Sequence, residues 1–143
     1  MLDTERAAGM HGAAYYSGFQ AQAESVKNAF LGFLLECRRE GRSVAAYGAA
    51  AKGNTLLNFA GVRADLLPFV VDASPHKQGR YLPGSRIPVV AEVRLREARP
   101  DFVVILPWNL RDEIAAQLAY IGEWGGRFVT AVPRLEIFGA VTP

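Results

Sequence analysis

A run of very small residues ending in a lysine and a glycine, Gly48-Ala-Ala-Ala-Lys-Gly-Asn54, is the segment best suited to chemistry. It follows an apolar run, 44–47, typical of a buried strand, and it precedes a predicted helix that begins near Asn54 or Thr55, either of which can cap it. Gly and Ala let a ligand approach the main chain, and the first N–H groups and dipole of a helix favour an anion. Because Lys52 adds a full positive charge, the segment predicts a site for a phosphate-bearing ligand.

The same segment departs from the known nucleotide-binding motifs. Residues 48–53 do not read G-x-G-x-x-G, and although they have the G-x-x-x-x-G spacing of a P-loop, Asn54 stands where that motif requires lysine. Lys52 lies on the wrong side of the second glycine, and no acidic partner for Mg²⁺ is evident on the next strand beyond Asp72. These departures exclude a nucleoside triphosphatase and leave a nicotinamide dehydrogenase as an alternative.

Asp72 ends the second predicted strand, 66–72. In a dinucleotide-binding fold, an acidic residue there, about 20 residues past the glycine loop, grips a ribose hydroxyl. The alternative is that Asp72 caps the following turn, 73–75, or pairs with Lys77. The sequence leaves both interpretations open.

A basic segment rich in Gly and Pro follows, His76-Lys-Gln-Gly-Arg-Tyr-Leu-Pro-Gly84, and it is predicted to be a loop. Lys77 and Arg80 place two cations beyond the carboxyl end of the second strand, and Tyr81 adds a ring and a hydroxyl. We favour a second clamp on an anionic ligand, since arginine offers phosphate a bidentate fork. A solvated basic loop is the alternative.

A third connection, Pro107-Trp-Asn109, follows the most continuous apolar run of the chain, 102–106, which predicts a strand buried on both faces. Asn109 is predicted to cap the helix over 110–124. Trp108 either stacks on a base or walls a sugar pocket, or it packs beneath that helix.

Strands alternating with helices imply a mostly parallel sheet with helices on both faces, so we expect an α/β, Rossmann-like three-layer domain. The expected strand order is about 3-2-1-4-5, with residues 19–143 forming the domain and residues 1–18 a linker or extension. In such a sheet the connections 48–54, 73–84 and 107–109 follow strands at one edge, where ligands bind. The predicted helices are 19–40, a second from about residue 54, 92–98 and 110–124, and the predicted strands are 44–47, 66–72, 87–90 at an edge, 102–106, 127–132 and, as a strand or extended segment, 135–138.

Composition narrows the function further. The chain has 143 residues, half of them hydrophobic, and a formal net charge of only +2, which does not suggest nucleic-acid binding. The single Cys37 excludes an internal disulfide and a Cys-rich zinc site, and on the apolar stripe of the first helix it is expected to be a small buried hydrophobe. No apolar run is long enough to span a membrane, and we expect a cytoplasmic protein.

Four ordered blocks of sequence are familiar together. They resemble the C-terminal domain of the S-adenosylmethionine-dependent sugar C-methyltransferases, which act on nucleotide-linked deoxysugars, over about residues 15 to 138. The blocks are Tyr47-Gly-Ala-Ala-Ala-Lys-Gly-Asn-Thr-Leu-Leu-Asn58, Val71-Asp-Ala-Ser-Pro-His-Lys-Gln-Gly-Arg-Tyr-Leu-Pro-Gly84, Ile105-Leu-Pro-Trp-Asn109 and Trp124-Gly-Gly126. The resemblance implies a Rossmann-like domain that follows a zinc module and a central S-adenosylmethionine-binding domain. It also implies that a thymidine-diphosphate type of sugar lies between the central domain and this Rossmann-like domain.

The residues expected to face that nucleotide sugar come from the first three blocks and from the segment around Asp72. No catalytic residue, metal or cofactor is assigned to this chain, because it has neither the zinc-ligand cysteines nor the central domain of the family, and S-adenosylmethionine belongs to the full-length enzyme. A stand-alone NAD- or nucleotide-binding module and a scaffold that binds no ligand are the alternatives. The expected substrate-binding residues are Tyr47, Gly48, Ala49, Ala50, Ala51, Lys52, Gly53, Asn54, Asp72, His76, Lys77, Arg80, Tyr81, Pro107, Trp108 and Asn109.

Overall fold

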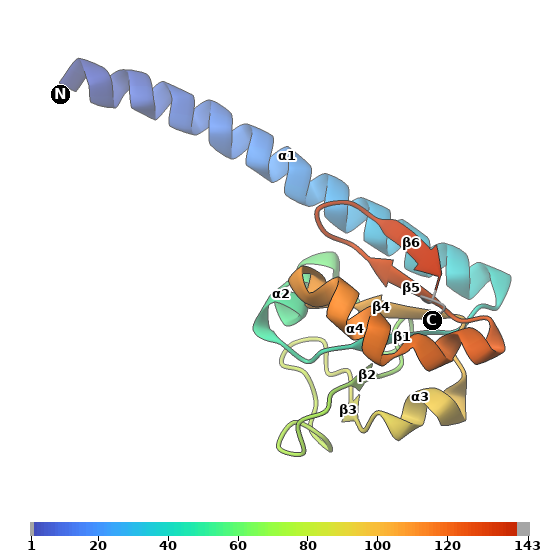
Figure 1. Ribbon diagram of the computed structural model, residues 1–143. Helices are drawn as coiled ribbons and strands as arrows, with labels where there is room; N and C mark the ends of the chain where they lie inside the picture. The colour runs from blue at the N-terminus through green and yellow to red at the C-terminus, as the bar shows by residue number, and fades with distance from the viewer. Residues whose placement is uncertain (1, 140–143) are drawn as a thin grey trace.

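The computed structural model describes residues 2–139, with side chains described from residue 21 onward except that of Lys52. A central sheet is covered by helices on both faces, and the N-terminal part of the first helix extends beyond the body (Figure 1). The elements in chain order are α1 (Leu2–Glu40), β1 (Val44–Tyr47), α2 (Ala51–Ala60), β2 (Val70–Val71), β3 (Val89–Val90), α3 (Val93–Ala98), β4 (Phe102–Ile105), a 3-10 turn (Trp108–Leu110), α4 (Arg111–Gln117), a second 3-10 segment (Ala119–Trp124), β5 (Arg127–Thr130) and β6 (Glu136–Gly139).

The sheet has the order β3-β2-β1-β4-β5-β6, which confirms the predicted order and adds one strand. The first five strands are parallel, while β6 runs antiparallel to β5. Tyr47 is level with Val71 on one neighbouring strand and with Ile105 on the other, so β1, β2 and β4 end at the same height. The edge position of β3 also confirms the prediction made from Pro88, whose missing N–H suits an edge.

Two apolar clusters fill the space between the sheet and its helices. On one face, α1 and α2 bury Phe30, Leu34, Cys37 and Leu57 against the sheet. The other cluster is formed against α3, α4 and the second 3-10 segment, which contribute Leu95, Ile114, Leu118 and Ile121. The strands feed both clusters because alternate side chains of a strand point to opposite faces. The predicted apolar stripe of the first helix is confirmed for its described members, and so is the buried state of Cys37, which is 4% exposed.

Several predicted boundaries were wrong. The first helix begins at Leu2 and not near Phe19, because residues 2–18 contain no proline and are rich in alanine, a strong helix former. The start of α2 is at Ala51, three to four residues before the predicted caps, since alanine and lysine also favour a helix. Phe59 of the same helix is 45% exposed, whereas Leu57 is fully buried. Whether residues 1–18 form a linker outside the domain stays a prediction.

The other differences concern length. β2 and β3 are two residues each, and the helix predicted over 110–124 is one α-helix, α4, between two 3-10 segments. Prolines 68 and 88 remove ladder donors around the short strands. No helix that the structure describes is both long and apolar enough to cross a membrane.

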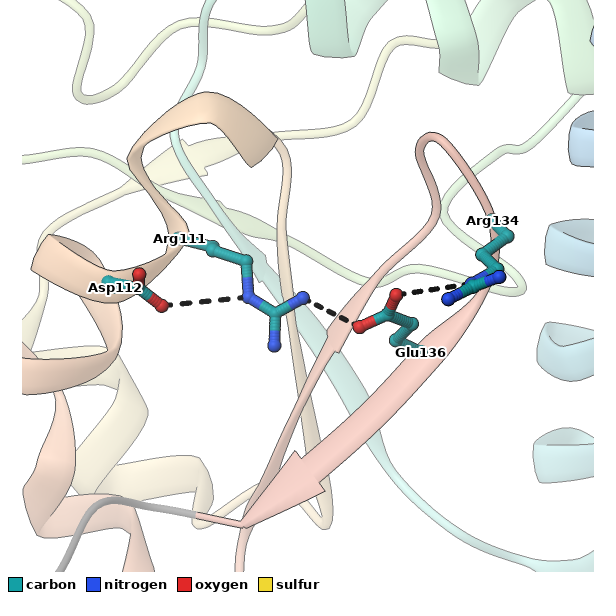
Figure 2. Close-up of polar contacts among 4 residues, drawn as sticks. All are labelled: Arg111, Asp112, Arg134 and Glu136. Carbon is teal, nitrogen blue, oxygen red and sulfur yellow. Dashed lines mark hydrogen bonds and ion pairs between the residues drawn. The ribbon is translucent and has the colours of Figure 1, made fainter.

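The edge strand β6 is tied to the start of α4 by charge. Glu136 accepts a hydrogen bond from Arg111 at 2.7 Å and another from Arg134 at 3.4 Å, as Figure 2 shows. Arg111 also lies 4.1 Å above the ring of Phe138 and forms an ion pair with Asp112. Arg111, and to a lesser degree Arg134, lowers the pKa of Glu136. These contacts hold the β5–β6 hairpin beside the connection 107–109.

Candidate functional site

Three connections meet at the carboxyl edge of the parallel strands. The Gly48 N–H donates to the carbonyl of Val71 at 2.8 Å, and the Leu106 N–H donates to the carbonyl of Tyr47 at 3.0 Å. The segments after β2 and β4 therefore lie on either side of the segment after β1. This arrangement confirms the expectation that 48–54, 73–84 and 107–109 share one rim of the sheet.

Glycine is required in the first connection for packing. Gly48 has a φ of +99°, and a Cβ there would lie 2.5 Å from Pro107 Cδ. A Cβ on Gly53, inside the first turn of α2, would lie 2.6 Å from the Cβ of Leu106. The two glycines thus let the start of α2 press against the end of β4. Both glycines are therefore needed for the packing of the fold, independently of any contact that the segment makes with a ligand.

The amino end of α2 faces this rim, because the helix begins directly after the connection from β1. Its N-cap residue is Ala50, and no side chain caps it. Asn54, one of the predicted caps, is the first residue whose N–H bonds back along the helix, to the Ala50 carbonyl at 3.0 Å. The positive end of the helix dipole is thus available to an anion. The side chain of Lys52 lies outside the described residues, so its predicted charge is not placed.

Asp72 caps a turn, as one of the two open interpretations expected. Its Oδ1 accepts the N–H of Ser74 at 2.8 Å, and its Oδ2 accepts the N–H of Ala49, also at 2.8 Å. Lys77 does not pair with Asp72, because its Nζ donates to the carbonyl of Ala49 at 3.0 Å. Gln78, which sequence reasoning missed, donates its amide to the carbonyl of Asp72 at 2.8 Å. The sequence signal that could have predicted this contact is a polar side chain six residues after Asp72 in the same loop.

A cleft of about 260 Å³ opens between the first two connections. Lys77 and Arg80 place two cations in its wall, and the exposed ring of Tyr81 adds an aromatic edge, so its chemistry suits an anion attached to a flat or apolar group. His76 is exposed and does not line this cleft. The lining residues are Ala49, Lys77, Arg80, Tyr81, Leu82, Pro83 and Val89.

Tyr47 is placed in the core and not at the cleft. Its side chain packs in the cluster beneath α3 and α4, where its hydroxyl accepts a hydrogen bond from Gln117 at 2.9 Å. Gln117 also donates to Glu92, which accepts the hydroxyl of Tyr120 as well, each at 3.0 Å. Burial, more than any neighbouring group, raises the pKa of Tyr47. The geometry gives no support to its predicted contact with the substrate.

The third connection contributes differently from the prediction. Trp108 is half-buried and lines an apolar groove of about 360 Å³ between α1 and α2, away from the cations. Pro107 packs against Gly48. Asn109 is exposed within the 3-10 turn, and its predicted capping role is wrong, because the N-cap of α4 is Leu110, with no side-chain cap. The 3-10 turn occupies the positions where a capped helix was expected.

A hollow of about 340 Å³ at the amino end of the sheet contains none of the predicted site residues. Glu36, Arg42, Asp101 and Arg127 line it, so both signs of charge are present there. Among the residues with described side chains, no three of the metal-binding types His, Cys, Asp and Glu cluster closely enough to hold a metal ion. The cleft beside Ala49 is therefore the candidate site.

Comparison with known proteins gives one consistent result. A family model described as the C-methyltransferase C-terminal domain matches residues 1–133. Over 140 residues, the chain is 33% identical to the C-methyltransferase NovU of Streptomyces niveus. The aligned region covers 98% of this chain and 33% of that relative, so the chain spans about a third of the length of the protein it matches.

Proposed function

Because this chain belongs to the family of C-methyltransferase C-terminal domains, we propose that it is the substrate-binding domain of an S-adenosylmethionine-dependent sugar C-methyltransferase. It holds the diphosphate of a nucleotide-linked sugar, of the thymidine-diphosphate type, for a methyltransferase domain that lies outside these 143 residues. The proposed setting is the cytoplasm, with no nucleic-acid or membrane partner.

The observation that carries the proposal is the meeting of two cations with the start of α2. Lys77 is bonded to the carbonyl of Ala49, one residue before the N-cap, and Arg80 lines the same cleft. A diphosphate bound there is met by a lysine, an arginine and the positive end of a helix dipole, three groups that each favour a phosphate anion. Tyr81 at the mouth offers a ring to the sugar or the base.

In this proposal the residues of this chain bind and orient the nucleotide sugar, and none of them takes part in the chemical reaction. In the complete enzyme, S-adenosylmethionine would supply a methyl group for the carbon beside a keto group of the sugar, once a base outside these residues had removed the proton from that carbon. The cleft itself is a poor fit for that cofactor, since Lys77 and Arg80 disfavour its sulfonium cation. The contribution of this domain is to fix the position of the substrate, which lowers the entropic cost of the transfer.

Calorimetry tests this directly. The chain is titrated with a thymidine-diphosphate sugar, and Lys77→Ala with Arg80→Ala should weaken binding by about tenfold or more, as expected for lost charge-assisted hydrogen bonds. Lys52→Ala should weaken it as well. Arg94→Ala is the matched control, because Arg94 is an exposed cation on α3 that pairs with Glu97. Binding of NAD alone would favour a dehydrogenase-like module, and binding of neither ligand would favour a scaffold.

A further inference from the structure

Asp72 has every polar group engaged by the protein itself. Its two carboxylate oxygens accept the N–H groups of Ser74 and Ala49, each at 2.8 Å. Its main-chain carbonyl accepts the Gln78 amide at 2.8 Å, and its N–H donates to Val90 at 3.1 Å. An acidic residue at the end of the second strand is the group that binds ribose in a dinucleotide-binding site, but here each carboxylate oxygen already accepts a main-chain N–H of a neighbouring loop.

The partner of this carboxylate is a residue of the proposed anion site. Both main-chain polar groups of Ala49 are held: its N–H donates to Asp72, and its carbonyl accepts from Lys77. The residue before it, Gly48, turns with a φ of +99° and donates to Val71. These bonds fix the direction in which the chain leaves β1, and hence where α2 begins and where the Lys77 ammonium lies.

We infer that Asp72 is a positioning residue that shapes the anion site through Ala49 without touching the ligand, and that the site does not read the ribose 2′-hydroxyl. The inference rests on the proposed function. Charge and positioning predict opposite effects of removing Asp72 on the affinity for an anion. Loss of a negative charge beside the site would by itself strengthen binding, whereas loss of the positioning role weakens it.

Three ligands separate the roles. Inorganic pyrophosphate has no ribose, and dUDP and UDP differ only in the 2′-hydroxyl. The wild-type chain should bind dUDP and UDP with equal affinity. Asp72→Ala should weaken the binding of all three ligands by the same factor of about ten, since the same fixed loop contacts each of them. Unchanged or tighter binding of pyrophosphate would overturn the inference, and so would a loss confined to UDP, which would show a contact with ribose.

Asp101 provides a matched control at the other end of the sheet. It accepts the N–H of Ser43 at 2.9 Å, the same kind of contact as that of Asp72 with Ala49. Asp101→Ala should lower stability but leave the affinity for all three ligands unchanged. An equal loss of affinity in both variants would mean that the effect of Asp72 is only structural.

Amide exchange followed by NMR keeps the inference testable without a ligand. In Asp72→Ala the amides of Ala49 and Ser74 should exchange at least about tenfold faster, because both lose their acceptor, while the Ser43 amide should not change. If the wild type binds none of the ligands, the proposed function fails, and exchange at Ala49 still decides whether Asp72 fastens the loop. Should Asp72→Ala not fold, Asp72→Asn replaces it, since one amide oxygen cannot accept both N–H groups in the same way. Unchanged exchange at Ala49 would overturn the inference.

Discussion

Gly53 of α2 and Leu106, the residue that follows β4, are in contact so close that a methyl group on the glycine would lie 2.6 Å from the Cβ of Leu106. The contact joins the helix whose amino end faces the proposed anion site to the strand that supports the neighbouring connection. Because Leu106 is 1% exposed and has no free space to retreat into, this approach sets how near α2 lies to the sheet.

We expect Gly53→Ala to destabilise the domain by about 1–3 kcal/mol, although alanine is favoured over glycine in helices by about 1 kcal/mol. The overpacking against Leu106 outweighs the gain in propensity, because Leu106 is surrounded by the packed core. Urea denaturation monitored by circular dichroism measures the change in the free energy of unfolding.

Gly32 of α1 is the matched control. A Cβ at this helical glycine would meet no atom within 4 Å. Gly32→Ala should therefore stabilise the chain by about 0.5–1 kcal/mol, the ordinary difference between the two residues. If both substitutions stabilise, the contact of Gly53 with Leu106 does not restrict the position of the helix.

The order of the strands was predictable because predicted strands alternate with predicted helices along the chain, which favours a parallel sheet. The apolar stripe of the first helix was predictable because apolar residues recur there every three or four positions. The start of α2 was not: Asn54 is a good capping residue, but the chain enters the helix earlier, at Ala51, where tertiary packing and alanine propensity win over a side-chain cap. The helical state of residues 2–18 was hidden by their glycines.

The candidate site was predicted in part for a physical reason as well. Parallel strands bring their carboxyl ends to one edge, so the meeting of Ala49 with Lys77 follows from topology. The direction of a side chain does not follow from topology. Tyr47 is the last residue of β1, so its side chain could turn toward the rim or pack in the core. It packs in the core because of how α4 lies on the sheet, which a single sequence does not reveal.

The burial of Cys37 predicts a thiol that is slow to react. Desolvation, helped by the nearby Glu40 carboxylate, raises the pKa of Cys37 from 9.0 to about 11, so the thiolate that reacts with alkylating agents is scarce at pH 8. Modification by iodoacetamide should be far slower in the folded chain than in 6 M urea. Comparable rates in both conditions would show that α1 separates from the sheet readily.

The same shift gives a dependence of stability on pH. Above pH 9.0 the unfolded chain releases the Cys37 proton while the folded chain keeps it until about pH 11, so the free energy of unfolding should fall as the pH rises through this range. Cys37→Ala should remove that part of the decline, although it also lowers stability at pH 7 by about 1 kcal/mol through lost packing. Denaturation curves at pH 8, 9 and 10 for both chains test this, and parallel declines would contradict it.

Glu136 predicts an opposite trend at acid pH. Arg111 and Arg134 hold its pKa below the ordinary value of 4.5, so the stability that it contributes is present above that value and is lost as the pH falls through the lower, folded pKa. Glu136→Gln should lose this acid-dependent part and should free the β5–β6 hairpin from α4. Since the Glu136 side chain is partly exposed, the effect should be small and should diminish in 0.5 M salt. A salt-independent difference would mean that the glutamine disturbs packing.

Tyr47 and Tyr120 lie at the two ends of a hydrogen-bonded chain through Gln117 and Glu92, and their substitution separates effects on stability from effects on binding. Tyr120 donates its hydroxyl to the carboxylate of Glu92 at 3.0 Å, whereas the hydroxyl of Tyr47 accepts from the neutral amide of Gln117 at 2.9 Å. Hydrogen bonds to charged groups are worth about 1.5–3 kcal/mol and neutral ones about 0.5–1.5 kcal/mol, so Tyr120→Phe should cost more stability than Tyr47→Phe. Because both hydroxyls point to the α3–α4 side, neither substitution should change the affinity for a thymidine-diphosphate sugar. A loss of affinity in Tyr47→Phe without a loss of stability would instead place that hydroxyl on the ligand.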